Sequence, residues 1–314
     1  MKFYVGLTDK NWFDFLKGIP REDVNFWRPS GGNFTAIPYG APFLLRLKAP
    51  YNVIAGVGFF TNHIILPITV AWDIFKERNG TESFSDFSAT IQRFRKNNRS
   101  NYEANPQVGC TVLTDPIFFK SEDWIPSPPD WKAPIVQGKS YDTTSHIGDA
   151  LWEEVMQKLL IYRTQSPTTN LSQSNLAFEE PAVYKNILSS VRVGQGAFRV
   201  MITNAYARKC AISGEKTLPV LQAAHILPYA SNGPNQTFNG LLLRSDLHTL
   251  FDSNYITVDA TNLRVNVSKR IKEEFLNGKE YYRFHGEKLA SLPKVIEDQP
   301  SKHLLQLHND RFLG

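Results

Sequence analysis

The sequence has few cysteines and no long hydrophobic run. Its 314 residues include two cysteines, Cys110 and Cys210, which lie in different halves of the chain. Two cysteines cannot supply a disulfide framework or a four-cysteine zinc module. No apolar run is long enough to span a bilayer, and the first residues lack the uninterrupted apolar core of a signal peptide. We therefore expect a cytoplasmic protein without a membrane partner.

The chain also lacks a strong excess of charge of either sign. Its formal net charge is +5, from 35 Lys and Arg against 30 Asp and Glu. Residues 1–164 hold 18 basic and 17 acidic residues, whereas residues 165–314 hold 17 and 13, a net of +4. A basic excess favours approach to a polyanion but does not identify one. Most of the excess lies in the second half, which also contains the motif described below.

The length predicts two domains, because one hydrophobic core usually stops growing at a smaller size. The stretch from 164 to 182 is rich in Ser, Thr, Asn and Gln, contains two prolines and has little periodicity, which is typical of an exposed linker. We predict a first domain over 1–164, a linker over 165–183 and a second domain over 184–314.

Hydrophobic patterns predict an α+β fold in which the first domain is a mixed β-barrel or half-barrel. Its predicted strands cover 2–7, 42–48, 52–60, 63–72 and 107–119, and its predicted helices cover 12–18, 84–97 and 146–163. In the second domain we predict helices over 183–192, 196–209, 246–253 and 269–276, two short strands within 210–226, and strands over 239–243, 255–259 and 263–267.

One stretch of the second domain, "LQAAHILPYASNGPNQTFNGLLLRSDLHTLFD" (221–252), concentrates polar side chains that suit metal chemistry. His225 ends a predicted strand, Asn239 follows a loop, and His248 lies on a predicted helix. Asp252 is four positions after His248, so both side chains can lie on one helix face and bind one ion.

Each of these residue types has a role in metal-assisted phosphodiester hydrolysis. A histidine near its neutral pKa can take a proton from the attacking water, and an asparagine carbonyl can orient its ring. A cation held by few protein ligands leaves positions open for the phosphate. Any one of these residues alone is more often structural, and Asn239-Gly240 alone would indicate a turn. The order and spacing of the set favour a site.

The motif "AAHI.P", "NG" and "LH.LFD" resembles the signature of the HNH endonucleases, which have a ββα-metal fold. The flanking stretches "GQGAFRVMITNAYARKCAISGE" and "NGLLLRSDLHTLFDSNYITVD" resemble predicted restriction endonucleases with a C-terminal HNH domain. The resemblance implies that His225 is the general base, that Asn239 orients it, and that His248 is a metal ligand. It places Asp252 where some colicin-type members have an additional ligand.

The chain departs from the family pattern at Ala224, where many HNH proteins have an Asp or His metal ligand. Waters and phosphate would then complete a site held by His248 and Asp252. Mg²⁺ or Mn²⁺ is the ion we expect first, with Ni²⁺ or Zn²⁺ as alternatives. The same departure keeps a second hypothesis open, in which the HNH fold is inactive and serves as a DNA-binding module.

Several basic residues of the second domain are candidates for contacts with DNA phosphates. Arg244 lies between the predicted strand and the metal-binding helix, where it could reach a phosphate. A basic rim is predicted from the remaining candidates, Arg208, Lys209, Lys269, Arg270 and Lys272. An ordinary solvated face explains the 269–272 cluster equally well.

The first domain, rich in strands, glycines and aromatic residues, loosely resembles the PUA-like group, which includes EVE-type and SRA-type readers of modified bases. A flipped base needs a pocket with aromatic walls, and the candidates for these walls are Trp12, Trp27, Phe34 and Tyr39. Core packing is the competing explanation for each of them.

Together these observations predict a metal-dependent restriction-type DNA endonuclease whose first domain recognises double-stranded DNA carrying a modified base. An effector nuclease, with a first domain that senses a protein or small ligand, is the alternative enzyme. One such site cuts one strand, so double-strand cutting would require a homodimer or two encounters.

Overall fold

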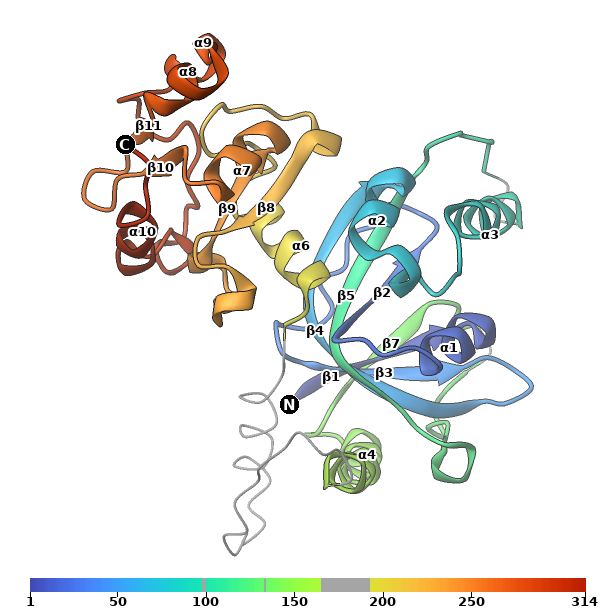
Figure 1. Cartoon of the computed structure of the whole chain (residues 1–314). Coiled ribbons are helices and arrows are strands. Elements are labelled where there is room, and N and C mark those ends of the chain that lie inside the picture. Colours follow the sequence, from blue (N-terminus) through green and yellow to red (C-terminus); the bar gives the residue numbers. More distant parts are fainter. Residues whose placement is uncertain (98–99, 133, 165–192) are drawn as a thin grey trace, which may run out of the picture. The chain divides into compact units, whose positions relative to one another are not determined.

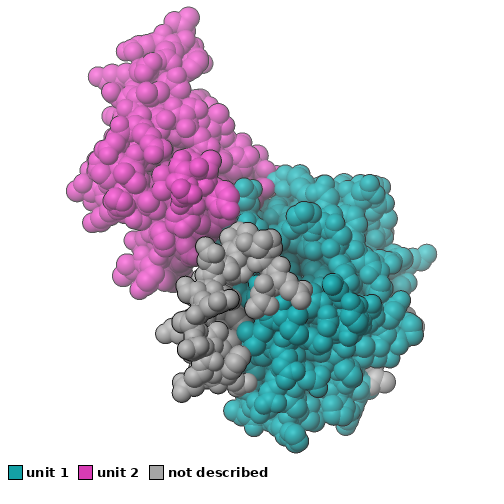
Figure 2. All heavy atoms as spheres, turned by 60° about the horizontal axis from the view of Figure 1, so that its bottom comes forward, with its two compact units in different colours: residues 1–197 teal, residues 198–314 magenta. Residues whose placement is uncertain are grey.

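The computed structural model describes residues 1–97, 100–132, 134–164 and 193–314 (Figure 1). The chain divides into two units, Met1–Ala197 and Phe198–Gly314 (Figure 2). The predicted linker over 165–183 and the predicted helix over 183–192 lie outside the described residues, so the predicted domain boundaries stay predictions. Among the helices within the described ranges, none is long and apolar enough to cross a membrane.

Unit 1 is built on a seven-stranded sheet with the order β2-β5-β4-β3-β1-β7, in which β6 pairs with β4. Strands β1 and β3 are parallel, and the other neighbours are antiparallel. The strands are β1 (Lys2–Thr8), β2 (Asp23–Arg28), β3 (Pro42–Leu47), β4 (Val53–Pro67), β5 (Gln107–Phe118), β6 (Ile125–Pro126) and β7 (Gly138–Asp142). Strands β2 and β7 are the two edges of this sheet, so the sheet is open. Of the two predicted forms, barrel and half-barrel, the structure has the half-barrel.

Unit 1 has two apolar clusters that join residues of this sheet to two of its helices, α1 and α4. The helices are α1 (Lys10–Lys17), α2 (Ile68–Phe75), α3 (Phe84–Asn97) and α4 (His146–Thr164). Asp9 caps the N-terminus of α1, and its carboxylate accepts hydrogen bonds from the backbone N–H groups of Asn11 and Trp12. Helix α4 contributes Leu151, Trp152 and other residues to one cluster, so the helix predicted over 146–163 packs against the sheet.

Two strand predictions in unit 1 differ from the structure. The predicted strands 52–60 and 63–72 share one long strand, β4 (Val53–Pro67), and the part of the second predicted strand after Pro67 is helix α2. The run is apolar on every side because Ile68, Val70 and Ala71 are all buried, so its periodicity does not separate strand from helix. Strand β2 was not among the predicted strands. Pairing with β5 along its whole length holds it in the sheet.

Unit 2 has two small antiparallel sheets, β8-β9 and β10-β11, packed with helices around one apolar cluster. Its strands are β8 (Leu221–His225), β9 (Gly240–Arg244), β10 (Ile256–Val258) and β11 (Val265–Val267). Its helices are α6 (Gln195–Ala205), whose first three residues belong to unit 1, α7 (Ser245–Asp252), α8 (Arg270–Phe275), α9 (Lys279–Tyr282) and α10 (Lys302–Asn309). Of the two strands predicted within 210–226, the second forms as β8, and residues 211–213 form a turn in place of the first. The α+β class is confirmed.

Candidate active site

A β-hairpin followed by a helix carries the residues of the motif. Strands β8 and β9 pair antiparallel with His225 opposite Gly240, and α7 follows β9 directly (Figure 1). Helix α6 packs closely on the hairpin, because a Cβ at Gly240 would lie 2.3 Å from Ile202 Cδ1. The order hairpin then helix is the ββα arrangement that the family resemblance implies.

Asn239 ties the long loop between the two strands to itself. Its Oδ1 accepts the backbone N–H of Leu227 at 2.9 Å, and its Nδ2 donates to the carbonyls of Leu227 and Pro234, each at 3.0 Å. The side chain is fully buried. All of these bonds go to the backbone, so the prediction that Asn239 orients the His225 ring is wrong, and Asn239 instead fixes the course of the loop that follows His225.

A different asparagine, Asn235, contacts the His225 ring. The His225 Nε2 atom lies 2.8 Å from Asn235 Oδ1. Because an amide oxygen only accepts, Nε2 carries the proton and Nδ1 keeps its lone pair. The Phe198 ring stacks on the same imidazole with centroids 3.9 Å apart and an interplanar angle of 13°. These two contacts fix both the tautomer and the plane of the ring.

Burial lowers the pKa of His225 below its ordinary value. The hydrogen bond to Asn235 and the charge of Asp252 raise it in part, and the neighbouring His248 lowers it. The imidazole is therefore neutral at pH 7, which is the state in which it can accept a proton.

His248 and Asp252 face each other across one turn of α7, as predicted. His248 Nε2 lies 3.2 Å from Asp252 Oδ2, and the other ring nitrogen, Nδ1, lies 2.7 Å from Gln222 Oε1. Because Gln222 Oε1 only accepts, Nδ1 carries a proton. Nε2 therefore faces the Asp252 carboxylate, and a metal cation between the two atoms could bind to both.

His225, His248 and Asp252 line one cavity of about 390 Å³. Its walls also include Ala223, Ile226, Pro228, Tyr229, Asn254, His308 and Arg311. His308 is structural, because its ring is buried between Thr257 Oγ1 and the carbonyl of Phe251. Within the described residues, no group of three or more His, Cys, Asp or Glu side chains could hold a metal ion. The candidate ligands are therefore the His248 and Asp252 pair, with room beside them.

Ala224 lies in the apolar core of unit 2 and is fully buried. At the position where many family members have a metal ligand, this chain therefore has only a methyl group, which packs in the apolar core. Gln222, two residues earlier on the same strand, places its amide oxygen at His248 instead.

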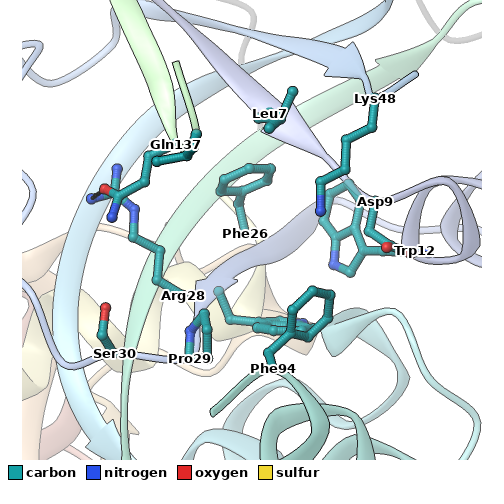
Figure 3. A pocket seen from close by; sticks show the side chains of 12 residues that line it. Leu7, Asp9, Trp12, Phe26, Arg28, Pro29, Ser30, Lys48, Phe94 and Gln137 are labelled. Atoms are coloured by element: carbon teal, nitrogen blue, oxygen red, sulfur yellow. Dashed lines mark hydrogen bonds between the residues drawn. The ribbon is translucent and has the colours of Figure 1, made fainter. Parts of the chain in front are cut away.

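Unit 1 has a separate cavity of about 280 Å³ with aromatic walls (Figure 3). Trp12 and Trp27 line it, as predicted for the walls of a base pocket, together with Phe26 and Phe94. Its polar lining includes Asp9, Arg28, Ser30, Lys48 and Gln137. Figure 3 shows Arg28 with Gln137 on one side and Lys48 with Asp9 on the other.

The other two predicted wall residues do not line this cavity. Phe34 is buried in an apolar cluster, where it packs edge-on against Tyr4 and Phe60. Tyr39 is 62% exposed. Core packing therefore accounts for Phe34, and the structure places Tyr39 on the surface outside the pocket.

Residues 210–259 match the HNH endonuclease family. Unit 2 contains an HNH endonuclease domain. The matched segment includes the β8-β9 hairpin, Asn239 with the loop that it binds, and the whole of α7. The family match and the ββα geometry therefore describe the same residues. The chain is accordingly a nuclease, and the expected HNH identity and enzyme class are confirmed.

Comparisons with whole structures give more distant similarities. The ASCH protein from Zymomonas mobilis is 14% identical, and the match covers 51% of this chain and 94% of that one with a TM-score of 0.30. The modification-dependent restriction endonuclease TagI is 13% identical, and the match covers 93% of this chain and 76% of that one with a TM-score of 0.28. Scores this low transfer no property to the present chain. No curated protein matches it.

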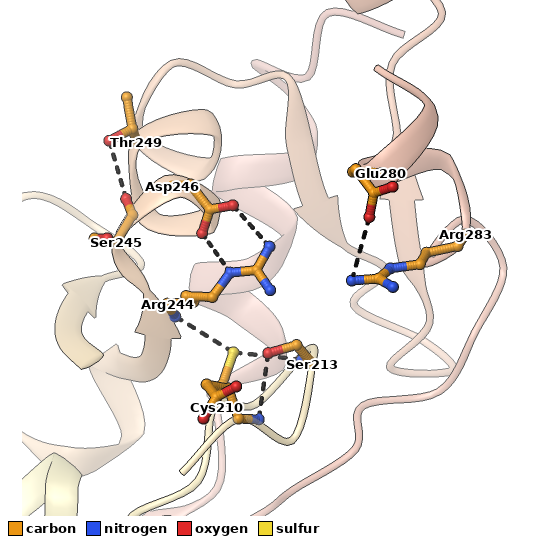
Figure 4. A network of polar contacts seen from close by, with 9 residues as sticks. Cys210, Ser213, Arg244, Ser245, Asp246, Thr249, Glu280 and Arg283 are labelled. Carbon is orange, nitrogen blue, oxygen red and sulfur yellow. Dashed lines mark hydrogen bonds and ion pairs between the residues drawn. The ribbon is translucent and has the colours of Figure 1, made fainter. Parts of the chain in front are cut away.

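The basic residues predicted to contact DNA lie at several places on the HNH unit. Arg244 forms a double ion pair with Asp246, at 2.6 and 2.7 Å, and its backbone N–H donates to Cys210 Sγ (Figure 4). Arg270 pairs with Glu274 on α8.

None of the six predicted DNA-contact residues lines the cavity of the HNH domain. The exposed members of the predicted rim are Arg208, Lys269, Arg270 and Lys272, while Lys209 is half-buried. Their contacts with DNA stay predictions.

Two site residues were missed from the sequence, Asn235 and Gln222. Asn235 lies in the loop between the strands, and its reach to His225 depends on the loop course that Asn239 imposes. Gln222 could have been predicted from its position in the sequence. It lies near one end of β8, and a helix packed on that strand can bring its own polar residues to it.

Proposed function

We propose that the HNH domain hydrolyses DNA phosphodiesters with His225 as the general base and with a divalent ion held by His248 and Asp252. The observation that carries this proposal is the cavity itself. The His225 imidazole, whose Nε2 is bound by Asn235, lines this cavity together with His248 and Asp252, whose Nε2 and Oδ2 atoms are 3.2 Å apart.

The donor set fits a divalent metal ion. Two atoms 3.2 Å apart can both reach one ion at bond lengths of about 2.1 Å. Gln222 Oε1 accepts a hydrogen bond from His248 Nδ1, which leaves Nε2 as the metal-binding atom. A nitrogen and an oxygen donor with open positions suit Mn²⁺, Ni²⁺ or Zn²⁺, and Mg²⁺ if water completes the shell. The bound ion would stabilise the negative charge of the leaving oxygen.

The chain's own residues would carry out the remaining steps. Asn235 and Phe198 hold the His225 ring, and its Nδ1 accepts the proton of the attacking water. The lowered pKa of His225 keeps this nitrogen unprotonated at neutral pH. Asn239 keeps the loop that carries Asn235 in place, so it acts on the base through the backbone rather than directly.

We propose further that unit 1 restricts cleavage to DNA with a modified base. The support is the cavity with Trp12 and Trp27 in its walls and cationic side chains at its rim. Aromatic faces stack on a flipped base, and Arg28 and Lys48 can contact the flanking phosphates. The cavity of about 280 Å³ is of the size that holds a small planar ligand.

The test uses the full chain with plasmids that carry no modification, 5-methylcytosine or 5-hydroxymethylcytosine, each with Mg²⁺ or Mn²⁺. We expect cutting of a modified plasmid, loss of cutting in His225→Ala, and no loss in His303→Ala, which changes an exposed histidine outside the cavity. Cutting that survives in His225→Ala would overturn the assignment of the base.

The reader is tested separately with Trp27→Ala. We expect this variant to lose its preference for modified DNA while it retains metal binding. Equal cutting of all plasmids by the unaltered protein would leave the nuclease standing and remove the reader, and would favour a unit 1 that senses another ligand.

A further inference from the structure

One arginine, Arg311, lines the cavity of the HNH domain among the described residues. It belongs to the segment that follows α10, outside the residues matched by the family. The cavity otherwise offers a base, a pair of metal ligands and apolar walls. A phosphodiester also needs a partner for its non-bridging oxygens, whose negative charge grows during hydrolysis.

The backbone that carries Arg311 is held in position. Leu313 N–H donates to the carbonyl of Asn254 at 3.0 Å, and Asn254 itself lines the cavity. On the other side of Arg311, the Asn309 amide donates to Thr257 Oγ1 at 2.7 Å and to the carbonyl of Val258 at 2.8 Å. Contacts on both sides therefore fix where the arginine side chain starts, which reduces the ordering that substrate binding requires.

The guanidinium of Arg311 forms no ion pair within the described residues. Other arginines of unit 2 are engaged: Arg244 with Asp246, and Arg270 with Glu274. Burial lowers the pKa of His308, another residue of the cavity wall, and the charge of Arg311 lowers it further. A planar cation with free donors beside a nuclease site suits bidentate binding of a phosphate.

We propose that Arg311 binds the scissile phosphate through its non-bridging oxygens and stabilises the charge that develops on them. This inference rests on the proposed function, because it assigns Arg311 to the same reaction. It replaces Arg244, the phosphate contact predicted from the sequence, with a residue from a distant part of the chain. Arg311 is thereby a catalytic residue contributed by the segment after α10.

The experiment compares Arg311→Gln with Arg283→Gln in the full chain. Both changes remove one exposed guanidinium from unit 2, but Arg283 lies outside the cavity. We expect Arg311→Gln to lower kcat for DNA cleavage about 100-fold, the loss typical of one charge-stabilising donor, and to leave Mn²⁺ affinity unchanged. Arg283→Gln should cut like the unaltered protein. Arg311→Lys should recover part of the rate, because it keeps the charge without the planar fork.

A second readout does not depend on cleavage. The logarithm of the association constant for a DNA duplex falls linearly with the logarithm of the salt concentration. Measured without added metal, this slope should be shallower by about 0.9 in Arg311→Gln, as expected for one lost phosphate contact. Equal rates and slopes for the two glutamine variants, together with an inactive His225→Ala, would overturn the role of Arg311 and leave the proposed function intact. Cleavage that survives in His225→Ala would overturn the proposed function, and the slope would then decide the phosphate contact alone.

Discussion

Replacing Asn239 by alanine tests whether this residue clamps the loop or orients the base. The structure gives its side chain three hydrogen bonds, all to backbone groups of Leu227 and Pro234. At about 1 kcal/mol for each bond, Asn239→Ala should lower the free energy of local opening of this loop by about 3 kcal/mol. The amides of the loop should therefore exchange hydrogen roughly 100-fold faster.

The assay is native-state hydrogen exchange of the full chain, read by mass spectrometry on peptides that cover residues 221–240. Asn235→Ala is the matched control. It removes the contact to the His225 ring and leaves the three bonds of Asn239 in place. We expect slower cleavage in both variants but strongly accelerated exchange in Asn239→Ala alone. Unchanged exchange in Asn239→Ala, or equal acceleration in the two variants, would refute the clamp.

Three further predictions concern the metal site, the base and unit 1. Gln222→Ala should weaken Mn²⁺ binding about 10- to 100-fold in calorimetric titration, because His248 loses the partner that fixes its tautomer, and Gln236→Ala should not; equal affinities would contradict this. The cleavage rate should rise with pH and should have reached its plateau by about pH 6.5, because burial lowers the pKa of His225 and the base is then deprotonated. A rate that still rises above about pH 7 would contradict this prediction. Burial lowers the pKa of His63 to about 4, so its contribution to the stability of unit 1 should be complete above about pH 6.5 and be lost as the pH falls towards 4. Thermal unfolding followed by tryptophan fluorescence should show this loss, and a profile equally steep in His63→Gln would exclude it.

The sequence predicts the elements of this fold best where one face is apolar and a terminator follows. Helix α3 occupies the predicted range 84–97, and strand β5 lies within the predicted 107–119. The sequence predicts a strand where helix α2 forms, because the buried residues surround the helix axis and several of them are β-branched. Pro67 carried the missing information, since a proline favours the first turn of a helix or the end of a strand.

The site was predictable where chemistry follows chain order and unpredictable where it depends on tertiary contacts. His225, His248 and Asp252 share one cavity, as their spacing indicated. The sequence predicts the wrong asparagine as the partner of the His225 ring, because Asn235 and Asn239 are only four positions apart and only the folded loop distinguishes them. Arg311 lies 59 positions after Asp252 in the chain, so no local pattern connects it to the cavity.

The two free cysteines are buried, and each unit contains one of them: Cys110 in unit 1 and Cys210 in unit 2. Burial raises the pKa of Cys110 to about 12, so its thiol does not react while unit 1 is folded. The Cys210 sulfur accepts the backbone N–H groups of Ser213 and Arg244, and it becomes accessible when that turn opens. A thiol reagent applied during gradual denaturation would thus label each cysteine as its own unit unfolds. The chain carries a built-in pair of reporters that separates the unfolding of its two units without any introduced label site.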